Sequence, residues 1–155
     1  MIRKATEDDL KPLVELYKQF MIYHNKLDPQ SYKVPSDSAC ENRIKYYFVG
    51  SSYNYDSVLC HETDNVIDGF VIYRLFSYDT SEGPDGSVYI YNIFVAENAR
   101  RKGIGTELIN ELFKLAKENH CSRVAIDVSI HNDTARKLYE KMGMIPISIH
   151  MEKRI

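Results

Sequence analysis

The chain has 155 residues, a mass of 18.0 kDa and a formal net charge of -2, from 20 basic and 22 acidic side chains. At roughly 150 residues per domain, this length predicts one domain, residues 1–155. Nucleic-acid binders usually carry a basic excess, so the charge balance argues against one. Residues 1–9 contain no apolar leader and no stretch reaches the length of a membrane span, so we expect a cytoplasmic protein without membrane or nucleic-acid partners.

The three cysteines, Cys40, Cys60 and Cys121, belong to no Cys-x-x-Cys motif. Because an odd number cannot all pair, we expect free thiols in a reducing compartment. The neighbouring pairs Cys60–His61 and His120–Cys121 lack the usual spacing of zinc ligands, so the sequence predicts no metal site.

The N-terminal part predicts one short strand followed by two helices. Residues 2–5 suit a strand, and Thr6 with the three acids after it suits a helix start, because an N-cap hydroxyl and acidic groups both favour the positive end of the helix dipole. Apolar residues then recur at steps of three and four over 10–21, as in an amphipathic helix. Two prolines interrupt this pattern, and a second helix is expected over about 37–48.

The middle of the chain changes to residues typical of strands. β-branched and aromatic residues predict strands over 57–61, 66–78 and 87–95. An Asp-Asn turn at 64–65 and a polar loop over 79–86 separate them. Together these segments predict an antiparallel meander.

The C-terminal part alternates helices and strands. We expect a helix over 103–119, a strand over 123–130, a helix over 132–142 that Gly143 stops, and a last strand over 144–155. The order β-α-α-β-β-β-α-β-α-β predicts an α/β (α+β) domain. Its mixed, mostly antiparallel sheet is flanked by helices and contains one parallel crossover.

The segment 99–106 (ARRKGIGT) lies between a predicted strand and a predicted helix. Gly103 and Gly105 allow the backbone to approach a ligand closely, and the free N–H groups that open the helix favour an anion. Three consecutive basic residues border this position, so it suits a phosphate or pyrophosphate. The spacing is neither that of the Rossmann motif nor that of nucleotide triphosphatases, and a polar loop that only eases helix entry is the alternative.

Three motifs resemble the GNAT superfamily of N-acetyltransferases. Residues 100–105 (RRKGIG) resemble the R/Q-x-x-G-x-G/A signature, and 89–95 (YIYNIFV) resemble the family's fourth strand. Residues 132–144 (NDTARKLYEKMGM) resemble its N-x-x-A-x-x-L-Y-E-K-x-G-F motif, with Met144 in place of Phe. The order of elements is similar throughout, so the resemblance implies a GNAT-like fold.

The resemblance also implies acetyl-CoA as co-substrate. In such proteins the fourth and fifth strands separate and the pantetheine arm lies between them, while loop amides hold the pyrophosphate. Asn132 is implied near the pantetheine arm, although it also suits the N-cap of its helix. Arg100 suits a structural role, with the next two basic residues near phosphates or on a solvated rim. The residues implied for acetyl-CoA are Ile93, Phe94, Val95, Arg100, Arg101, Lys102, Gly103, Ile104, Gly105, Thr106 and Asn132.

Tyr139 is the implied catalytic residue, as the proton donor to the leaving thiolate. It follows Asn132 by seven residues on a helix, so both share a face. The backbone N–H of Val95 is expected to stabilise the oxyanion formed during acyl transfer. The alternative for Tyr139 is a core aromatic, because apolar residues flank it.

The general base and the acceptor are less defined. Many relatives carry a Glu on the fourth strand, but Tyr89 and Tyr91 occupy the matching positions and are not bases at neutral pH. A water relay to a backbone carbonyl, Asp127 or His131 is the alternative, and strand propensity also explains the tyrosines. The first helix and the loop after it usually shape the acceptor pocket in this family. The acceptor candidates are Tyr23, His24, Tyr32, Tyr89 and Tyr91.

We therefore expect an N-acetyltransferase that moves an acetyl group from acetyl-CoA to a primary amine of a small molecule. Residues 69–95 resemble diamine acetyltransferases, so polyamine-like acceptors are one option and amino-acid-like amines another. A protein lysine or N-terminal acetyltransferase, or a weakly catalytic CoA-binding protein, is the alternative. Residues 148–153 alternate apolar and polar side chains near a predicted sheet edge, so we also expect a homodimer.

Overall fold

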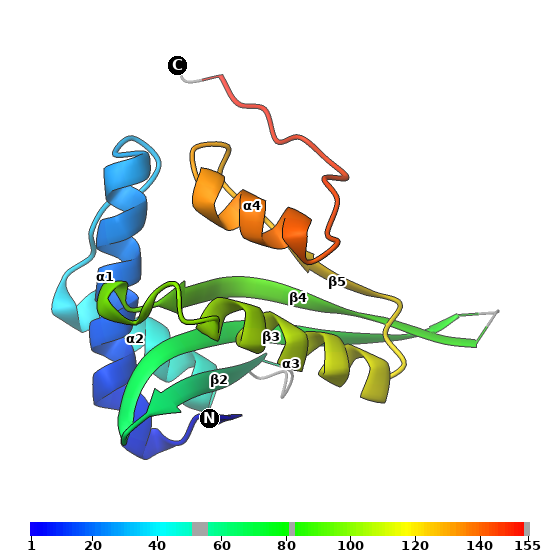
Figure 1. The fold of residues 1–155 in the computed structure, drawn as a ribbon, viewed down its shortest axis with the longest axis horizontal. Coiled ribbons are helices and arrows are strands. Elements are labelled where there is room, and N and C mark those ends of the chain that lie inside the picture. The colour runs from blue at the N-terminus through cyan, green and yellow to red at the C-terminus, as the bar shows by residue number, and fades with distance from the viewer. Residues whose placement is uncertain (51–55, 81–82, 154–155) are drawn as a thin grey trace.

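The computed structural model describes residues 1–50, 56–80 and 83–153 (Figure 1). A five-stranded sheet, four α-helices and shorter turns make up this part of the chain. The elements are β1 (Ile2–Lys4), η1 (Glu7–Asp9), α1 (Leu10–Leu27), α2 (Asp37–Lys45), η2 (Tyr46–Gly50), β2 (Asp56–Thr63), β3 (Val66–Thr80), β4 (Gly83–Val95), η3 (Glu97–Ala99), α3 (Ile104–Glu118), β5 (Arg123–Ile126) and α4 (Asp133–Lys141).

The strands lie in the order β1-β2-β3-β4-β5. The first three pairings are antiparallel, and β4 pairs with β5 in parallel because α3 carries the chain back between them. The predicted α/β class and the mixed, mostly antiparallel sheet are confirmed. Each predicted helix is also found within a few residues of its expected bounds.

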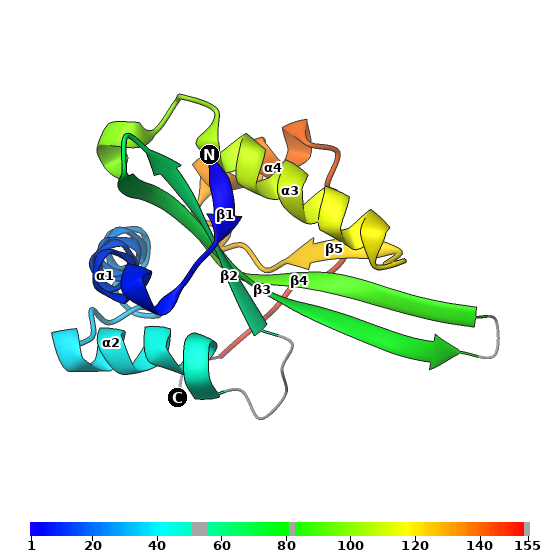
Figure 2. The ribbon, with the colours of Figure 1, turned by 90° about the horizontal axis from the view of Figure 1, so that it is seen from below.

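Helices cover both faces of the sheet, with α3 on one face and α1 and α2 on the other (Figure 2). The sequence of β3 explains this, because successive residues of a strand point to opposite faces. Gly69 faces α3, where an added Cβ would lie 3.1 Å from Ile104 Cγ2. The next residue, Phe70, faces α1 and lies edge-on to Phe20 at 6.4 Å between ring centroids.

A charged cluster ties β1 to β2 and to the start of α1. The Arg3 guanidinium contacts Asp9 at 2.7 Å and Glu62 at 2.7 Å. Hydrogen bonding from Arg3 is the main reason that the pKa of Asp9 falls from 3.8 to about 2. Thr6 precedes the helix as predicted, and its backbone N–H and its hydroxyl both donate to the Asp9 carboxylate, at 2.8 and 3.1 Å.

A β-bulge interrupts the pairing of β3 with β4. Ile72 lies opposite Asn92 and Tyr73 lies opposite Ile90, so Tyr91 is the extra residue of β4. An extra residue of this kind bends a strand and shifts the alternation of its side chains. Two residues that would point to opposite faces of a regular strand can therefore point to the same face of the sheet when the bulge lies between them.

Contacts of the bulge residue and of a residue after it confirm this shift. Tyr91 lies 6.4 Å from Tyr47, which follows α2. Phe94 lies 6.0 Å from Phe20 of α1. Both β4 rings therefore face the side of α1 and α2, although they are three positions apart.

The boundaries of β3, β4 and β5 differ from prediction. A loop was expected within 79–86, but β3 continues to Thr80 and β4 starts at Gly83 (Figure 1). Main-chain hydrogen bonds between the two strands continue outward as a hairpin arm, and such bonds do not depend on the polarity of the side chains. Residues 81–82 lie outside the described part. β5 ends at Ile126 rather than 130, where its pairing with β4 stops.

The predicted last strand is wrong for residues 144–153, which lie outside the sheet. Gly143 ends α4 with a left-handed backbone, φ +84, as predicted for a C′ glycine. The chain then leaves α4 in a direction that takes it away from β5 (Figure 1). Within the part of the chain that the structure describes, no helix combines the length and apolar character needed to cross a membrane.

Candidate active site

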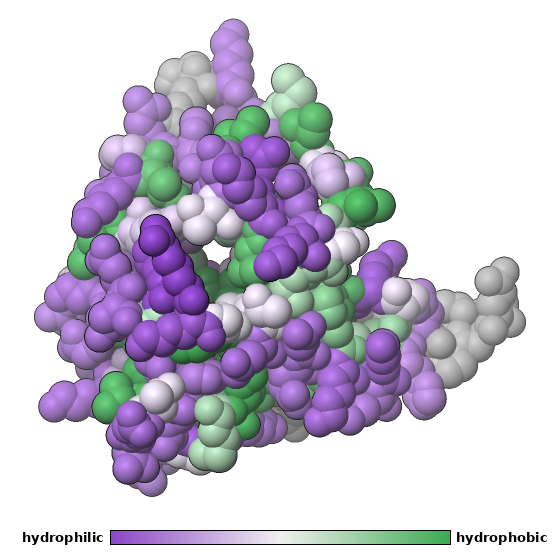
Figure 3. Space-filling model, in the orientation of Figure 1, coloured by the Kyte–Doolittle hydropathy of each residue, from purple (hydrophilic) through white to green (hydrophobic). Residues whose placement is uncertain are grey.

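The candidate site is the gap where β4 and β5 separate. Their parallel pairing runs from Ser87–Arg123 to Ile90–Ile126 and stops there, while β4 continues to Val95. Beyond the last pair, alternate backbone groups of β4 point away from β3 into this gap. The surface is hollowed where α1, α4 and β4 meet (Figure 3). A ligand lying in the gap can therefore pair with β4 as a neighbouring strand would.

The loop before α3 lies at the open end of the gap. Arg101 and Gly103 both have left-handed backbones, with φ 64 and φ 90. The first hydrogen bond of α3 runs from Glu107 N–H to the Gly103 carbonyl at 3.0 Å. The N–H groups of residues 104–106 precede that bond and have no acceptor within the helix. Such a cluster of amides favours an anion.

Gly105 brings three elements together at the loop. A Cβ on this residue would lie 3.3 Å from Leu138 Cδ2 of α4 and 4.0 Å from Val95 Cγ2 of β4. A side chain here would require the end of Leu138 to shift by a few tenths of an ångström. The glycine that sequence analysis assigned to ligand approach therefore also sets the packing of α3 against α4.

The basic run at 100–102 is divided between the interior and the surface. Arg100 Nε donates to the Val95 carbonyl at 3.1 Å, and its guanidinium lies 4.7 Å from the ring of Tyr23 and 5.2 Å from the ring of Phe94. Arg101 and Lys102 are exposed beside the α3 N-terminus. Arg100 therefore holds the end of β4 against α1, and the two other cations are available to a bound anion.

Asn132 caps α4 and links it to α1. Its Oδ1 accepts from the Ala135 N–H at 3.2 Å, as the sequence predicted for an N-cap, and from the Tyr23 hydroxyl at 3.3 Å. The residue is only 7% exposed. This bridge joins two helices that are 109 residues apart at the contact, across the mouth of the gap.

Tyr139 lies on the same side of α4 as Asn132 and is 8% exposed. Burial, with a smaller effect of the neighbouring Tyr23 phenol, raises the pKa of Tyr139 to about 12. Its hydroxyl makes no hydrogen bond to any described residue, and among these residues only His24 Nδ1 is both sealed from solvent and unpartnered. The Tyr139 hydroxyl therefore reaches accessible space as a protonated donor.

Tyr89 forms a contact that sequence analysis did not find. Its hydroxyl donates to Asp127 Oδ2 at 2.5 Å, and burial followed by this hydrogen bond raises the pKa of Tyr89 to about 12. The register could have indicated the pair, because Tyr89 lies opposite Ala125 and Asp127 is two residues further along the same face. A carboxylate thus reaches the closed end of the gap from β5.

The acceptor candidates fall into two groups. Tyr89 and Tyr91 pack together on β4 with ring centroids 5.2 Å apart. On α1, His24 lies 5.6 Å from Tyr23 and 4.8 Å from Tyr32. Burial lowers the pKa of His24, which keeps the ring neutral near pH 7. Tyr23 is the member of this second group that contacts α4.

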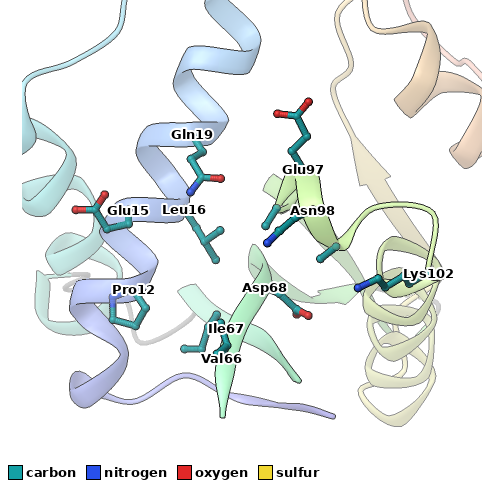
Figure 4. Close-up of a pocket in the computed structure, with 12 residues that line it drawn as sticks. Pro12, Glu15, Leu16, Gln19, Val66, Ile67, Asp68, Glu97, Asn98 and Lys102 are labelled. Carbon is teal, nitrogen blue, oxygen red and sulfur yellow. The ribbon is translucent and has the colours of Figure 1, made fainter. Parts of the chain in front are cut away.

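A separate open pocket of about 590 Å³ lies on the other side of the loop, between α1 and the start of β3 (Figure 4). Of the predicted ligand residues it contains Lys102 alone. Asp68 also lines it, but its carboxylate contacts His61 Nδ1 at 2.6 Å. No group of three or more possible metal ligands occurs among the residues with described positions.

Comparison with known families identifies the chain. The Acetyltransferase (GNAT) family matches residues 10–144, so the chain belongs to this family. The resemblance read from the three motifs is therefore confirmed. The match includes the bulged strand, the loop before α3 and the whole of α4.

The matches to curated relatives cover different shares of those proteins. It is 27% identical over 144 residues to the spermine/spermidine N(1)-acetyltransferase of Bacillus subtilis, covering 92% of this chain and 85% of the relative. It is 28% identical over 111 residues to the aminoglycoside N(6')-acetyltransferase type 1 of Serratia marcescens, covering 70% and 75%. The matched regions span only 27% of YobR and 52% of YdgE, two uncharacterized N-acetyltransferases of B. subtilis.

Solved structures share the fold. A mutant form of the BH1408 protein of Bacillus halodurans has a TM-score of 0.87 at 22% identity, covering 100% of this chain and 99% of that one. The aminoglycoside N-acetyltransferase AAC(6')-Iy in complex with CoA has a TM-score of 0.71 at 19% identity, covering 100% and 93%.

Proposed function

We propose that this protein transfers an acetyl group from acetyl-CoA to a primary amine of a small molecule. The unpaired edge of β4 beyond Ile90, beside the N-terminus of α3, is the observation that carries the proposal. Membership of the GNAT family supports it, as do relatives named for polyamine and aminoglycoside acetylation.

The residues around the gap suit the parts of acetyl-CoA. The amide-like pantetheine arm needs donors and acceptors in a line, which the backbone of Ile93–Val95 provides. The pyrophosphate needs amides and cations, which residues 101–106 provide. The Asn132 side chain uses its oxygen for the helix cap and for Tyr23, which leaves its amide nitrogen to donate to the arm.

Acetyl-CoA supplies an acetyl group already activated as a thioester. Tyr139 supplies the proton that the departing sulfur needs. Its raised pKa, about 12, keeps that proton on the phenol throughout the neutral and mildly alkaline range. The Val95 N–H is the donor proposed for the developing oxyanion. Arg100 Nε donates to the carbonyl of the same residue at 3.1 Å, which holds the end of β4 beside the site.

The Tyr89–Asp127 pair takes the place of the missing strand carboxylate. An amine with a pKa of about 10 arrives protonated, so it must lose a proton before it attacks the thioester carbonyl. Asp127 is exposed, so it is able to accept that proton directly or through water and release it to solvent. Tyr89 stays protonated and fixes one carboxylate oxygen at 2.5 Å, which makes it a positioning residue.

An amine panel tests the function itself. With spermidine, an aminoglycoside, free amino acids, a lysine peptide and a peptide with a free N-terminus, we expect acetyl-CoA-dependent thiol release with the small amines, because the tyrosines of β4 and the Asp127 carboxylate beside them suit a small cation. Turnover of peptides alone would support protein acetylation instead. Binding of acetyl-CoA without turnover of any amine would indicate a CoA-binding protein.

Gly103→Glu tests the placement of the pyrophosphate. It puts a negative charge where the anion is expected, so acetyl-CoA affinity by calorimetry should fall at least about tenfold. Gly143→Glu is the matched control, because it adds the same side chain at a similar φ, +84 against +90, with no atom within 4 Å of the new Cβ. Equal losses of affinity in both variants would show that backbone strain, not the anion site, is responsible.

Tyr139→Phe tests the proton donor. Removal of the hydroxyl should lower kcat about a hundredfold or more, while acetyl-CoA affinity and Tm change little because the ring still packs. Tyr46→Phe, on a tyrosine that is 47% exposed after α2, should leave kcat unchanged. If Tyr139→Phe keeps the wild-type kcat when chemistry limits the rate, Tyr139 is a core aromatic only.

Asp127→Asn tests the proton acceptor through pH. At neutral pH kcat/KM should fall about a hundredfold, since the amine must then lose its proton without help. The loss should shrink as the pH approaches the amine's own pKa, where the free base no longer needs an acceptor. Tyr89→Phe should show a smaller loss with the same pH trend.

Asp133→Asn, at an exposed carboxylate, is the control for the change of charge and should leave the pH dependence of kcat/KM unchanged. A loss in Asp127→Asn that is the same at every pH would contradict a role in proton transfer. In that case Asp127 would contribute to the structure of the site and not to proton transfer.

A further inference from the structure

A cation lies among the aromatic side chains of β3 and β4. The guanidinium carbon of Arg74, Cζ, is 5.5 Å from the centre of the Tyr91 ring and 5.7 Å from the centre of the Phe76 ring. Both distances are within the range over which the face of an aromatic ring attracts a cation. The two rings therefore hold the guanidinium in place on β3, a strand where sequence analysis placed no site residue.

Strand alternation places Arg74 on the face of the sheet that carries the aromatic surface of β4. Phe70 of β3 faces α1, and Arg74 is four positions further along the same strand, so both side chains point to one face. Arg74 also lies directly opposite Tyr89 in the pairing of β3 with β4, and the side chains of such a pair are neighbours. Both residues are half-buried, so each keeps some contact with solvent. Arg74 therefore lies beside the acceptor candidates of β4.

Opposite charges flank the Tyr89 ring on this face. The Tyr89 hydroxyl contacts the Asp127 carboxylate at 2.5 Å on the side of β5, and Arg74 lies next to Tyr89 on the side of β3. Neighbouring strands are about 4.8 Å apart, so β3 and β5 are about 10 Å apart across β4. A small molecule that contacts both charges needs an amine and an acidic group with a short chain of several bonds between them.

The guanidinium disfavours an acceptor that is cationic at both ends. A diamine with one nitrogen at Asp127 places its second ammonium near Arg74, where like charges repel. A carboxylate at that end instead gains charge-assisted hydrogen bonds, and the planar guanidinium matches both of its oxygens. Asp56 of β2 lies opposite Arg74 in the strand pairing, but five N–H donors allow a guanidinium to serve a substrate and its own chain together.

We propose that Arg74 determines specificity by binding a carboxylate of the acceptor, which is then a small amine with a carboxylate several bonds from its nitrogen. This inference rests on the acetyl transfer proposed above and names the class of its substrate. The amine end lies at Asp127, and the acid end lies over β3 at Arg74. The rings of Tyr89 and Tyr91 contact the chain between the two ends.

Three five-carbon amines that differ only at the far end test the class of substrate. δ-Aminovalerate ends in a carboxylate, pentylamine in a methyl group and cadaverine in a second ammonium. We expect kcat/KM to be at least about tenfold higher for δ-aminovalerate than for pentylamine, and lowest for cadaverine. The difference should lie in KM, because Arg74 binds the end of the acceptor that does not react.

Arg74→Met removes the charge and keeps a side chain of similar length. The preference for δ-aminovalerate over pentylamine should disappear and cadaverine should improve, whereas Arg74→Lys should keep part of the preference. The ratio of two substrates measured on one preparation does not depend on how much of the variant is folded. Arg123→Met, at an exposed arginine of β5, is the matched control and should keep the wild-type ratio.

Calorimetry on the CoA-bound protein separates this inference from the proposed function. Tighter binding of δ-aminovalerate than of pentylamine, lost in Arg74→Met, would support the carboxylate site even without acetylation of any amine, and only the proposed function would then fail. Affinities that are equal or undetectable for both amines would overturn the inference, as would a preference that Arg74→Met leaves unchanged. Acetylation of cadaverine in preference to δ-aminovalerate would also overturn it, while acetyl transfer to a small amine would stand.

Discussion

Between Ile90 and Asn92, β4 contains one residue more than β3, and the rest of the site depends on this extra residue. The bulge bends β4 at the position where its pairing with β5 ends, so the two strands separate instead of continuing as a closed sheet. It also changes the phase of the side chains, which brings the Tyr91 ring in the bulge and the Phe94 ring after it to the same face. One local irregularity therefore provides both an unpaired backbone edge and an aromatic surface beside it.

The gap stays open because its walls are tied together by polar contacts rather than filled by side chains. Arg100 connects the last carbonyl of β4 to the rings of Tyr23 and Phe94, and Tyr23 connects α1 to the cap of α4 through Asn132. On the other wall, the close approach at Gly105 sets how near α3 lies to α4. A ligand that enters the gap therefore finds its walls already in position, which lowers the entropic cost of binding.

Local sequence signals predicted the elements well where the signal was itself local. The amphipathic periods of α1 and α3, the N-cap at Asn132 and the C′ glycine at 143 all depend on residues within a few positions of each other. The strand ends were predicted less well. β5 stops at Ile126 although residues 127–130 have a similar composition, because the loss of its neighbour, not its own sequence, ends the strand. The alternation over 145–151 predicts a strand, yet a strand also needs a partner, and its own chain directs it away from the only free edge beside β4 among the described strands.

By itself, the sequence determined the family, the glycine-rich and basic composition of the loop before α3 and the shared face of Asn132 and Tyr139, because each is encoded in a short run of residues. Only the tertiary structure decided that Arg100 turns inward while its two neighbours stay exposed, that Tyr23 bridges two helices, and that Tyr89 holds Asp127. These contacts join residues 5, 109 and 38 positions apart. A side chain's choice among such partners depends on the distance between packed elements, which is fixed only when the whole sheet and its helices assemble.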